Sequence, residues 1–215
     1  MSESDLRILA FDTSAAHCAV ALFSGGRMLA HAREEMSKGQ AERLMPMLSD
    51  VSDGFAVDAL AVCTGPGNFT GIRIAVAAAR GLALSRGIPA VGVSALDSLA
   101  PLQGEALVVA DARQGRLYSQ LFRDGQAVNA PDMLEIDEIA QAAPQCWHIV
   151  GHRAEEVAER LASTDWREAP HADLAAIARL AAERIAAGTV ERPAPLYLRP
   201  ADAAVPSEAP PTLLP

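Results

Sequence analysis

The chain has 215 residues, of which 50% are hydrophobic, 21% are charged and only 4% are aromatic. This hydrophobic share is large enough to build a core, which excludes an intrinsically disordered protein. The length suits one large domain or two small domains packed together. The net charge of −9 argues against a stand-alone nucleic-acid-binding protein, because an acidic surface repels phosphate backbones.

Cysteine use and the N-terminal residues indicate a cytoplasmic protein. Cys18, Cys63 and Cys146 form no CxxC pair, which argues against a disulfide framework and against a thiolate zinc site. Residues 1–14 place acidic side chains before a short apolar run, the opposite of a signal peptide. No apolar run approaches the roughly 20 residues that span a bilayer. We therefore expect a cytoplasmic chain with no membrane contact.

The first half of the chain alternates short apolar strands with helices. Glycines at 25 and 26 indicate a hairpin turn between the second and third strands, and Ser94 is a candidate helix cap. In chain order, the pattern predicts strands over Ile8–Phe11, Cys18–Phe23 and Met28–Arg33, a helix over Gln40–Val51, a strand over Ala59–Cys63, a helix over Thr70–Ser85, a strand over Ala90–Val93 and a helix over Ala95–Ala100.

The second half begins with a similar pattern. Phe23 follows Asp12 by 11 positions, and Phe122 follows Asp111 by the same 11 positions. Each tract reads as an apolar strand, an acid, a polar loop, a second strand and a glycine turn, which favours an internal duplication; the alternative is coincidence between common strand–turn–strand patterns. Further elements are predicted as strands over Ala106–Ala110, Arg116–Phe122 and Gln145–Val150, helices over Ala154–Ala162 and Leu174–Ala187, and a strand-like segment over Leu196–Leu198.

A duplicated β-β-β-α-β-α unit, with an aspartate ending the first strand of each copy, is the plan of the actin-like ATPase fold, which is an α/β fold with ribonuclease H-like lobes. We predict a first lobe over residues 1–102 and a second over residues 103–200, whose last helix can pack back on the first lobe. Residues 201–215 hold much of the proline and are expected to form a mobile tail.

A glycine-rich loop between a strand and a helix is the most informative segment. It runs through Gly65, Pro66, Gly67, Asn68, Phe69, Thr70 and Gly71. Backbone N–H groups at such a helix start suit a phosphate or another anion, but no Gly-Lys-Ser/Thr ending is present, so it is not a Walker A loop. The alternative is a tight turn in which Asn68 or Thr70 caps the helix. We expect Gly65 and Gly67 to need backbone angles that other residues avoid.

Two strand ends could face a nucleotide across the cleft between the lobes. Asp12, Thr13 and Ser14 end the first strand, and Asp111 holds the same place in the second half. These residues are therefore candidate phosphate or nucleotide contacts together with the glycine loop. The alternative is that Asp12 caps local backbone.

The segment GPGNFTGIRI closely resembles the GPGSFTGLRIG signature of the TsaB (YeaZ) family, with Asn68 in place of the usual serine. The segments ILAFDTS, DARQGRLY and PLYLR agree, so the resemblance spans about residues 6–200. It implies an actin-like fold of the Gcp-like, M22 peptidase-like superfamily. It also implies a non-catalytic dimerisation subunit that binds and activates a TsaD-type paralogue, which transfers threonylcarbamoyl to adenosine-37 of tRNAs reading ANN codons.

The same resemblance implies further partners and a lack of intrinsic chemistry. A TsaE-type ATPase joins the larger complex, tRNA is bound only indirectly, and the isolated chain forms a homodimer. The catalytic relative holds a metal partly through an HxxxH pair, for which this chain has Gln40 and Leu44. We therefore expect no metal, no catalytic residue and no intrinsic cofactor, with ATP or ADP bound only at the interface with the partner.

Rival functions remain open on the residues alone. The chain could be an independent ATP-binding enzyme of the actin-like fold, an M22-type peptidase or a plain homodimer. No GxSxG nucleophile motif is present. The histidines favour ordinary structural or solvated roles, because His17, His31 and His171 have no acidic or histidine partner at helical spacing, and a turn separates His148 from His152.

The two N-terminal helices are the predicted partner surface. The second helix is apolar nearly all round, which predicts burial on more than one face, and its small residues allow close approach of another helix. The family resemblance favours pairing through both helices; the alternative is a helix buried wholly in its own domain. The predicted interface residues are Gln40, Leu44, Met47, Arg73, Ile74, Ala77, Ala78 and Gly81.

Overall fold

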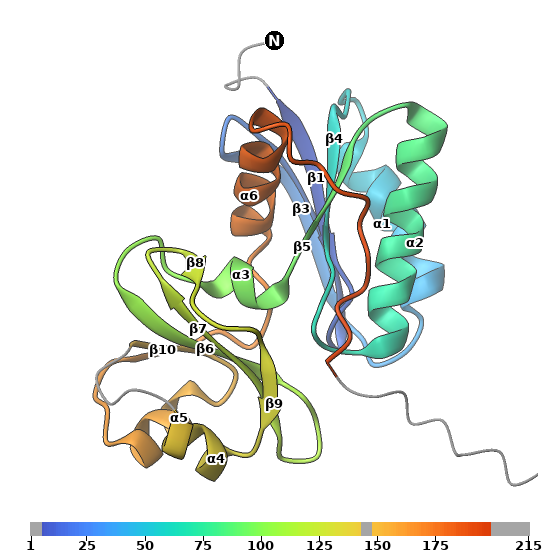
Figure 1. The fold of residues 1–215 in the computed structure, drawn as a ribbon. Helices are drawn as coiled ribbons and strands as arrows, with labels where there is room; N and C mark the ends of the chain where they lie inside the picture. The colour runs from blue at the N-terminus through green and yellow to red at the C-terminus, as the bar shows by residue number, and fades with distance from the viewer. Residues whose placement is uncertain (1–5, 143–147, 199–215) are drawn as a thin grey trace, which may run out of the picture.

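The computed structural model describes residues 6–142 and 148–198, which form two α/β lobes (Figure 1). The first lobe has a five-stranded sheet in the order β3-β2-β1-β4-β5. Within it, β1 pairs antiparallel with β2 and parallel with β4, and β5 extends the parallel side. The strands are β1 Arg7–Asp12, β2 His17–Ser24, β3 Arg27–Glu35, β4 Ala59–Cys63 and β5 Ala90–Val93.

The second lobe has a sheet in the order β11-β10-β6-β7-β8, with β9 also paired to β7. β6 pairs antiparallel with β7 and parallel with β10, as β1 pairs with β2 and β4. The strands are β6 Glu105–Asp111, β7 Leu117–Arg123, β8 Gln126–Ala127, β9 Asp132–Leu134, β10 His148–Gly151 and β11 Trp166–Glu168. The two sheets repeat one topology, which confirms the predicted duplication.

The helices cover both faces of the first sheet. Alternate residues of β1 serve the two faces, with Leu9 and Phe11 packed toward α1 and α2, and Ile8 and Ala10 packed toward α6 (Figure 1). Because β1 and β4 are buried on both faces, their sequences are continuous apolar runs instead of alternating apolar and polar residues. The helices are α1 Gln40–Ser52, α2 Phe69–Arg86, α3 Ala95–Leu99, α4 Ile136–Ala142, α5 Ala154–Leu161 and α6 Leu174–Ala186.

Each half of the sequence contributes one helix that packs on the sheet of the other half. α6 follows the second sheet along the chain but packs on the first sheet, through Ile177, Ala178 and Ala181. Conversely, Leu96 and Leu99 of α3 pack on the second sheet. α4 and α5 cover the opposite face of that second sheet (Figure 1). The chain segments that lead into α3 and into α6 therefore connect the two lobes.

Short local signals set the helix ends. The Asn68 side chain accepts a hydrogen bond from the Thr70 amide, and α2 ends at Gly87, which has a left-handed φ of 64°. Ser94 caps α3 as predicted, by accepting from the Leu96 amide. The side chain of Asp173 caps α6.

Residues 189–198, here called the C-terminal strap, follow α6 without regular secondary structure and cross β5 toward α2 (Figure 1). The prediction of a strand over Leu196–Leu198 is wrong. The Leu196 amide makes a single bond to the Thr64 carbonyl, and Pro193 and Pro195 have no N–H to form a ladder. The predicted Gln145–Val150 strand begins at His148 in the described part, and residues 145–147 and the predicted tail lie outside it. β8, β9, α4 and β11 were not predicted.

The described helices do not include one that combines the length and the apolar character needed to cross a bilayer.

Candidate functional site

The end of β1 and the glycine loop are packed together. The Asn68 amide donates to the Ser14 carbonyl over 2.6 Å, and the Thr13 hydroxyl donates to the Gly71 carbonyl over 2.7 Å. A Cβ at Gly67 would collide with the Ser14 carbonyl, and one at Gly71 with the Thr13 carbonyl. The glycines therefore permit close contact between two loops of the same chain.

The rest of the glycine loop is tied to its surroundings in the same way. Gly65 has a φ of 88°, as expected for a position that favours glycine, and its carbonyl accepts from the Ala95 amide at the start of α3. Pro66 is buried, whereas Phe69 and Thr70 are exposed. The loop thus links the first sheet to the helix that packs on the second sheet.

Asp12 uses both carboxylate oxygens within the chain. Oδ1 accepts from the Ser14 amide at 2.7 Å, and Oδ2 bonds Nε2 of His17 at 2.9 Å. Burial alone would raise the pKa of Asp12, but the hydrogen bonds from His17 and Ser14 and the charge of His17 hold that pKa below its usual range. The carboxylate is 1% exposed, so its geometry is that of a buried structural acid.

His17 has two partners that the sequence reading missed. Besides Asp12, its ring meets the ring of His171, with centroids 4.7 Å apart. The expectation that both histidines stand alone is therefore wrong. Helical spacing was the wrong test, because His17 begins β2 and His171 lies in the connection between β11 and α6.

Asp111 has a different environment from its counterpart Asp12. It is exposed, and its Oδ1 accepts from the Arg113 amide at 2.8 Å. It lies on the wall of a cavity of about 100 Å³ between the lobes, lined also by Ser14, Gly67, Asn68, Arg113 and His171. Sites for small organic ligands usually measure about 300–1,000 Å³. The cavity and the engaged Asp12 do not fit the nucleotide that the fold family implies.

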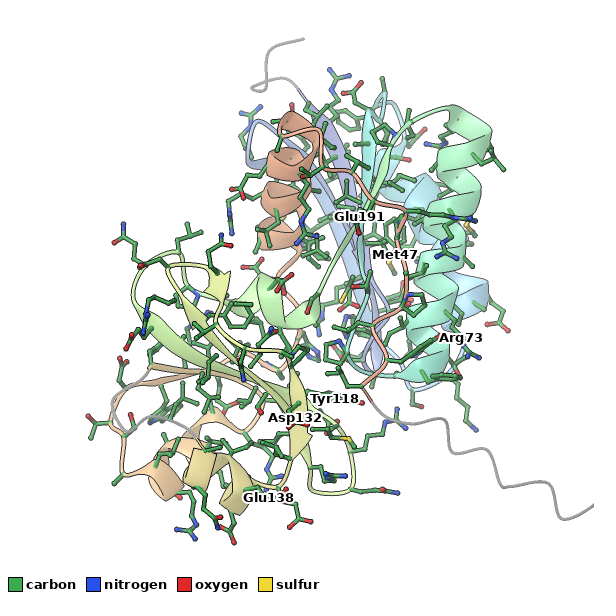
Figure 2. The ribbon with its side chains drawn as sticks, in the orientation of Figure 1. Met47, Arg73, Tyr118, Asp132, Glu138 and Glu191 are labelled. Carbon is green, nitrogen blue, oxygen red and sulfur yellow. The ribbon has the colours of Figure 1, made fainter. Side chains whose placement is uncertain are left out.

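The structure corrects the predicted interface on α1. Leu44 and Met47 are fully buried against the first sheet, where Met47 lies in Figure 2. Gln40 is 5% exposed and donates from Nε2 to the Met36 carbonyl. Leu44 and Met47 face their own core, because the apolar period of an amphipathic helix marks the inward face. Gln40 is instead held by its bond to the chain just before the helix. The outward residues include Ala41 and Met45.

On α2 the predicted residues divide between core and surface. Ile74 and Ala78 are partly buried against the first lobe's core, whereas Ala77 and Gly81 are exposed. Leu84, which was not predicted, is 88% exposed. A helix buried wholly in its own domain is therefore excluded. Glu42, Asp50 and Arg86 are also exposed on these helices. We call the following exposed residues the α1–α2 face: Ala41, Met45, Arg73, Ala77, Gly81 and Leu84.

Arg73 is held at the N-terminal end of α2 by two aromatic rings (Figure 2). Its guanidinium carbon lies 3.5 Å from the centroid of the Phe69 ring, and its Nε donates to the Tyr197 hydroxyl at 2.7 Å. Stacking of this kind fixes a long side chain that would otherwise move freely. The cluster forms one end of the α1–α2 face.

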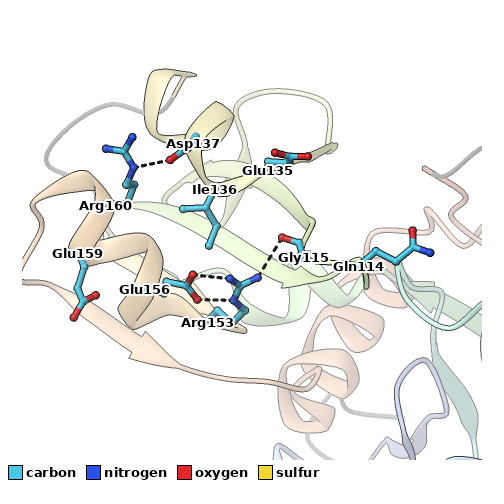
Figure 3. Close-up of a pocket in the computed structure, with 9 residues that line it drawn as sticks. All are labelled: Gln114, Gly115, Glu135, Ile136, Asp137, Arg153, Glu156, Glu159 and Arg160. Carbon is cyan, nitrogen blue, oxygen red and sulfur yellow. Dashed lines mark hydrogen bonds and ion pairs between the residues drawn. The ribbon is translucent and has the colours of Figure 1, made fainter.

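The equivalent helix pair of the second lobe is charged instead of apolar (Figure 3). α4 and α5 border an open groove of about 630 Å³. Arg153 bonds Glu156 through both Nε and Nη2, and Arg160 bonds Asp137 at 2.6 Å. Because the duplicated fold places solvated ion pairs here, the apolar character of the α1–α2 face is not imposed by the architecture.

The positions that would hold metal in the catalytic relative are unsuited to it here. Leu44 has no ligand atom, and the glutamine at position 40 is a poor ligand for zinc or iron. Across residues 6–142 and 148–198, no three His, Cys, Asp or Glu side chains are grouped closely enough to hold a metal ion.

The sequence model of the family described as "TsaD: tRNA N6-adenosine threonylcarbamoyltransferase" matches residues 33–203, well over half of the chain. The chain belongs to this family. Within it, the chain is of the TsaB/YeaZ type. The tRNA threonylcarbamoyladenosine biosynthesis protein TsaB of Escherichia coli strain K12 is 39% identical over 126 residues, which are 53% of this chain and 53% of that protein. The matched region thus spans about half the length of the curated relatives.

Solved structures agree with this placement. YeaZ from Pseudomonas aeruginosa superposes with a TM-score of 0.75 at 28% identity, covering 90% of this chain and all of that chain. The ethanolamine utilization protein EutJ from Carboxydothermus hydrogenoformans has a TM-score of 0.51 at 13% identity, covering 79% of this chain and 88% of that chain, which supports the fold alone. The predicted actin-like α/β fold with two mixed sheets is confirmed.

Proposed function

We propose that this chain is a non-catalytic subunit for threonylcarbamoyladenosine-37 formation in tRNA, and that it binds and activates a TsaD-type paralogue through the α1–α2 face. The observation that carries the proposal is the contrast between the duplicated helix pairs. α1 and α2 expose the large apolar side chains of Met45 and Leu84 among charged residues, whereas the described residues of α4 and α5 expose paired charges and no large apolar side chain. An apolar surface on one copy only is typical of a protein interface.

The composition of the α1–α2 face favours a helical partner. Ala77 and Gly81 have no long side chains, and a Cβ added at Gly81 would meet no atom within 4 Å. Such positions let a second helix approach closely, while Met45 and Leu84 supply apolar area on either side. A standard interface buries about 800 Å² on each partner, which two helices of this length can provide.

The buried Asp12 and the small cavity between the lobes support a non-catalytic role. A catalytic acid must reach its substrate, yet both oxygens of Asp12 are engaged inside the chain. We therefore assign the transfer step to the paralogue. In this proposal tRNA and a TsaE-type ATPase join through the complex, and ATP or ADP binds only where this chain meets its partner.

The experiment is co-expression with the TsaD-type paralogue, followed by affinity purification and mass spectrometry. Ala77→Glu and Leu84→Glu should each weaken pairing at least about 30-fold, because a central charge at an interface costs about 2 kcal/mol or more. Ala78→Glu is a poorer choice, since Ala78 packs partly against this chain's own core. Ala175→Glu on the exposed part of α6 is the matched control.

The outcomes separate the rival functions. Loss of pairing and of tRNA modification in both variants, with the Ala175→Glu chain unaffected, supports the proposal. Pairing that survives both charges contradicts the assignment of the face. Threonylcarbamoyl transfer, peptide hydrolysis or ATP turnover by the purified chain alone contradicts the non-catalytic role.

A further inference from the structure

The C-terminal strap is fastened to the first lobe at successive points. The Arg80 Nε of α2 donates to the Pro193 carbonyl at 2.7 Å, and the Leu196 amide donates to the Thr64 carbonyl at 2.9 Å. Gly92 of β5 lies under the strap, where an ideal Cβ would be 3.3 Å from the Cα of Pro193. The strap therefore has a defined path although it has no regular secondary structure.

The last described residues of the strap reach across to the second lobe. Tyr197 lies over α2, with its ring 5.1 Å from that of Phe69 and its hydroxyl bonded to Arg73. Leu198, the next residue, packs against the core cluster of the second sheet, which includes Leu96 and Phe122. Two adjacent residues thus bind opposite lobes.

One of these contacts is made next to the glycine loop that borders the cavity between the lobes. Thr64, which accepts from Leu196, directly precedes the glycine loop that forms one wall of that cavity. Two-lobed proteins that bind ligands between their lobes open and close by hinge motion. Because Pro193, Leu196 and Tyr197 bond the strap to the first lobe, the packing of Leu198 on the second lobe opposes such motion.

We propose that the C-terminal strap is a clamp that holds the two lobes closed, so that this chain is a rigid body and admits no nucleotide between them. The clamp accounts for a cavity of about 100 Å³ in a fold whose two-lobed design would permit a larger one. The inference does not depend on the proposed partner, because every contact it uses lies within this chain.

The test is amide hydrogen exchange on the full chain, with small-angle X-ray scattering on the same samples. Leu198→Ala removes the contact with the second lobe, and Leu102→Ala, at an exposed leucine, is the matched control. We expect the Asp173 amide, which donates to Ser98 Oγ and so joins the start of α6 on the first lobe to α3 on the second sheet, to exchange about tenfold faster in Leu198→Ala. Exchange in β1 and β6 should stay unchanged, and the radius of gyration should rise.

Equal exchange of Asp173 in Leu198→Ala and the control would overturn the clamp. If Leu198→Ala instead raises exchange throughout the chain, the double variant Arg80→Gln, Tyr197→Phe decides, since it loosens the strap from α2 only. Faster exchange confined to Asp173 and Leu196 then supports the clamp, and unchanged exchange contradicts it. Protection of the glycine loop when Mg·ATP is added to the parent chain would also overturn it.

Discussion

His17 and His171 meet edge to face, with ring planes at 75°, although one begins β2 and the other precedes α6. Nδ1 is buried in both rings and has no hydrogen-bond partner among the described residues. The contact joins the buried Asp12–His17 pair to the connection that arrives from the second lobe. His171 is partly buried at this junction, and its titration makes stability depend on pH.

Stability should fall as the pH drops below about 6.5. Burial, followed by the nearby charges of Arg33 and His17, lowers the pKa of His171, although Glu35 and Asp12 oppose this shift. The folded state therefore binds a proton less readily than the unfolded chain, which takes up the proton first as the pH falls. Thermal unfolding followed from pH 7.5 to 5 measures the effect.

His171→Phe keeps an aromatic ring at the junction and removes its titration. The melting temperature of this variant should fall less between pH 7 and pH 5 than that of the parent chain. His31→Phe, at an exposed position of β3, is the control and should leave the pH dependence unchanged. Identical pH profiles for the parent and His171→Phe would contradict the role of His171.

Two glycines of α2 should respond in opposite directions to alanine. Gly71→Ala forces a methyl group against the Thr13 carbonyl, and should lower the free energy of unfolding by about 1–3 kcal/mol. Gly81→Ala fills open space and should raise it by about 1 kcal/mol, because alanine favours helix. Urea denaturation of both variants is the measurement. If both variants changed the free energy of unfolding in the same direction, the contact between Gly71 and the Thr13 carbonyl would not determine the effect of Gly71→Ala.

The two strand-end aspartates should differ in their importance for stability. Asp12→Ala leaves Nε2 of His17 and the Ser14 amide buried without their partner, which should cost about 3 kcal/mol or more. Asp111→Ala removes one exposed bond to the Arg113 amide and should cost about 1 kcal/mol. Chemical denaturation compares them. Equal losses would refute the distinction between a buried and a solvated acid.

The isolated chain should bind neither zinc nor iron tightly. The reason is that Leu44 has no ligand atom and that the glutamine at position 40 is a poor metal ligand. Elemental analysis after gentle purification should find well below one metal ion per chain, and EDTA should leave the melting temperature unchanged. Stoichiometric metal, or a melting temperature lowered by EDTA, would contradict this expectation.

Most of the fold could be predicted from the sequence, because the spacing of apolar residues and the glycines at turns determine most strands and helices locally. The helix start at Asn68 and the cap at Ser94 are examples. The two-residue β8 and the three-residue β11 could not be predicted, since such short segments carry no periodic signal. Their pairing depends on neighbours that are distant in the sequence.

The candidate site was harder to predict than the fold. Apolar spacing identified Leu44 and Met47 correctly as a helical stripe, but spacing alone cannot tell a core face from an interface. The exposed Met45 lay between them and gave the better signal, because an apolar residue off the stripe has no place in the core. The His17–His171 contact could not be inferred, because tertiary packing alone brings the two rings together.

The course of the strap over β5 also bears on solubility. β5 is the last strand of the first sheet, and an open edge of this kind can recruit a strand from another molecule and start aggregation. Here the Gly92 carbonyl accepts a hydrogen bond from Arg184, and the adjacent Pro193 has no amide to offer a neighbour. The chain therefore shields its own sheet against fibril-like growth at this edge.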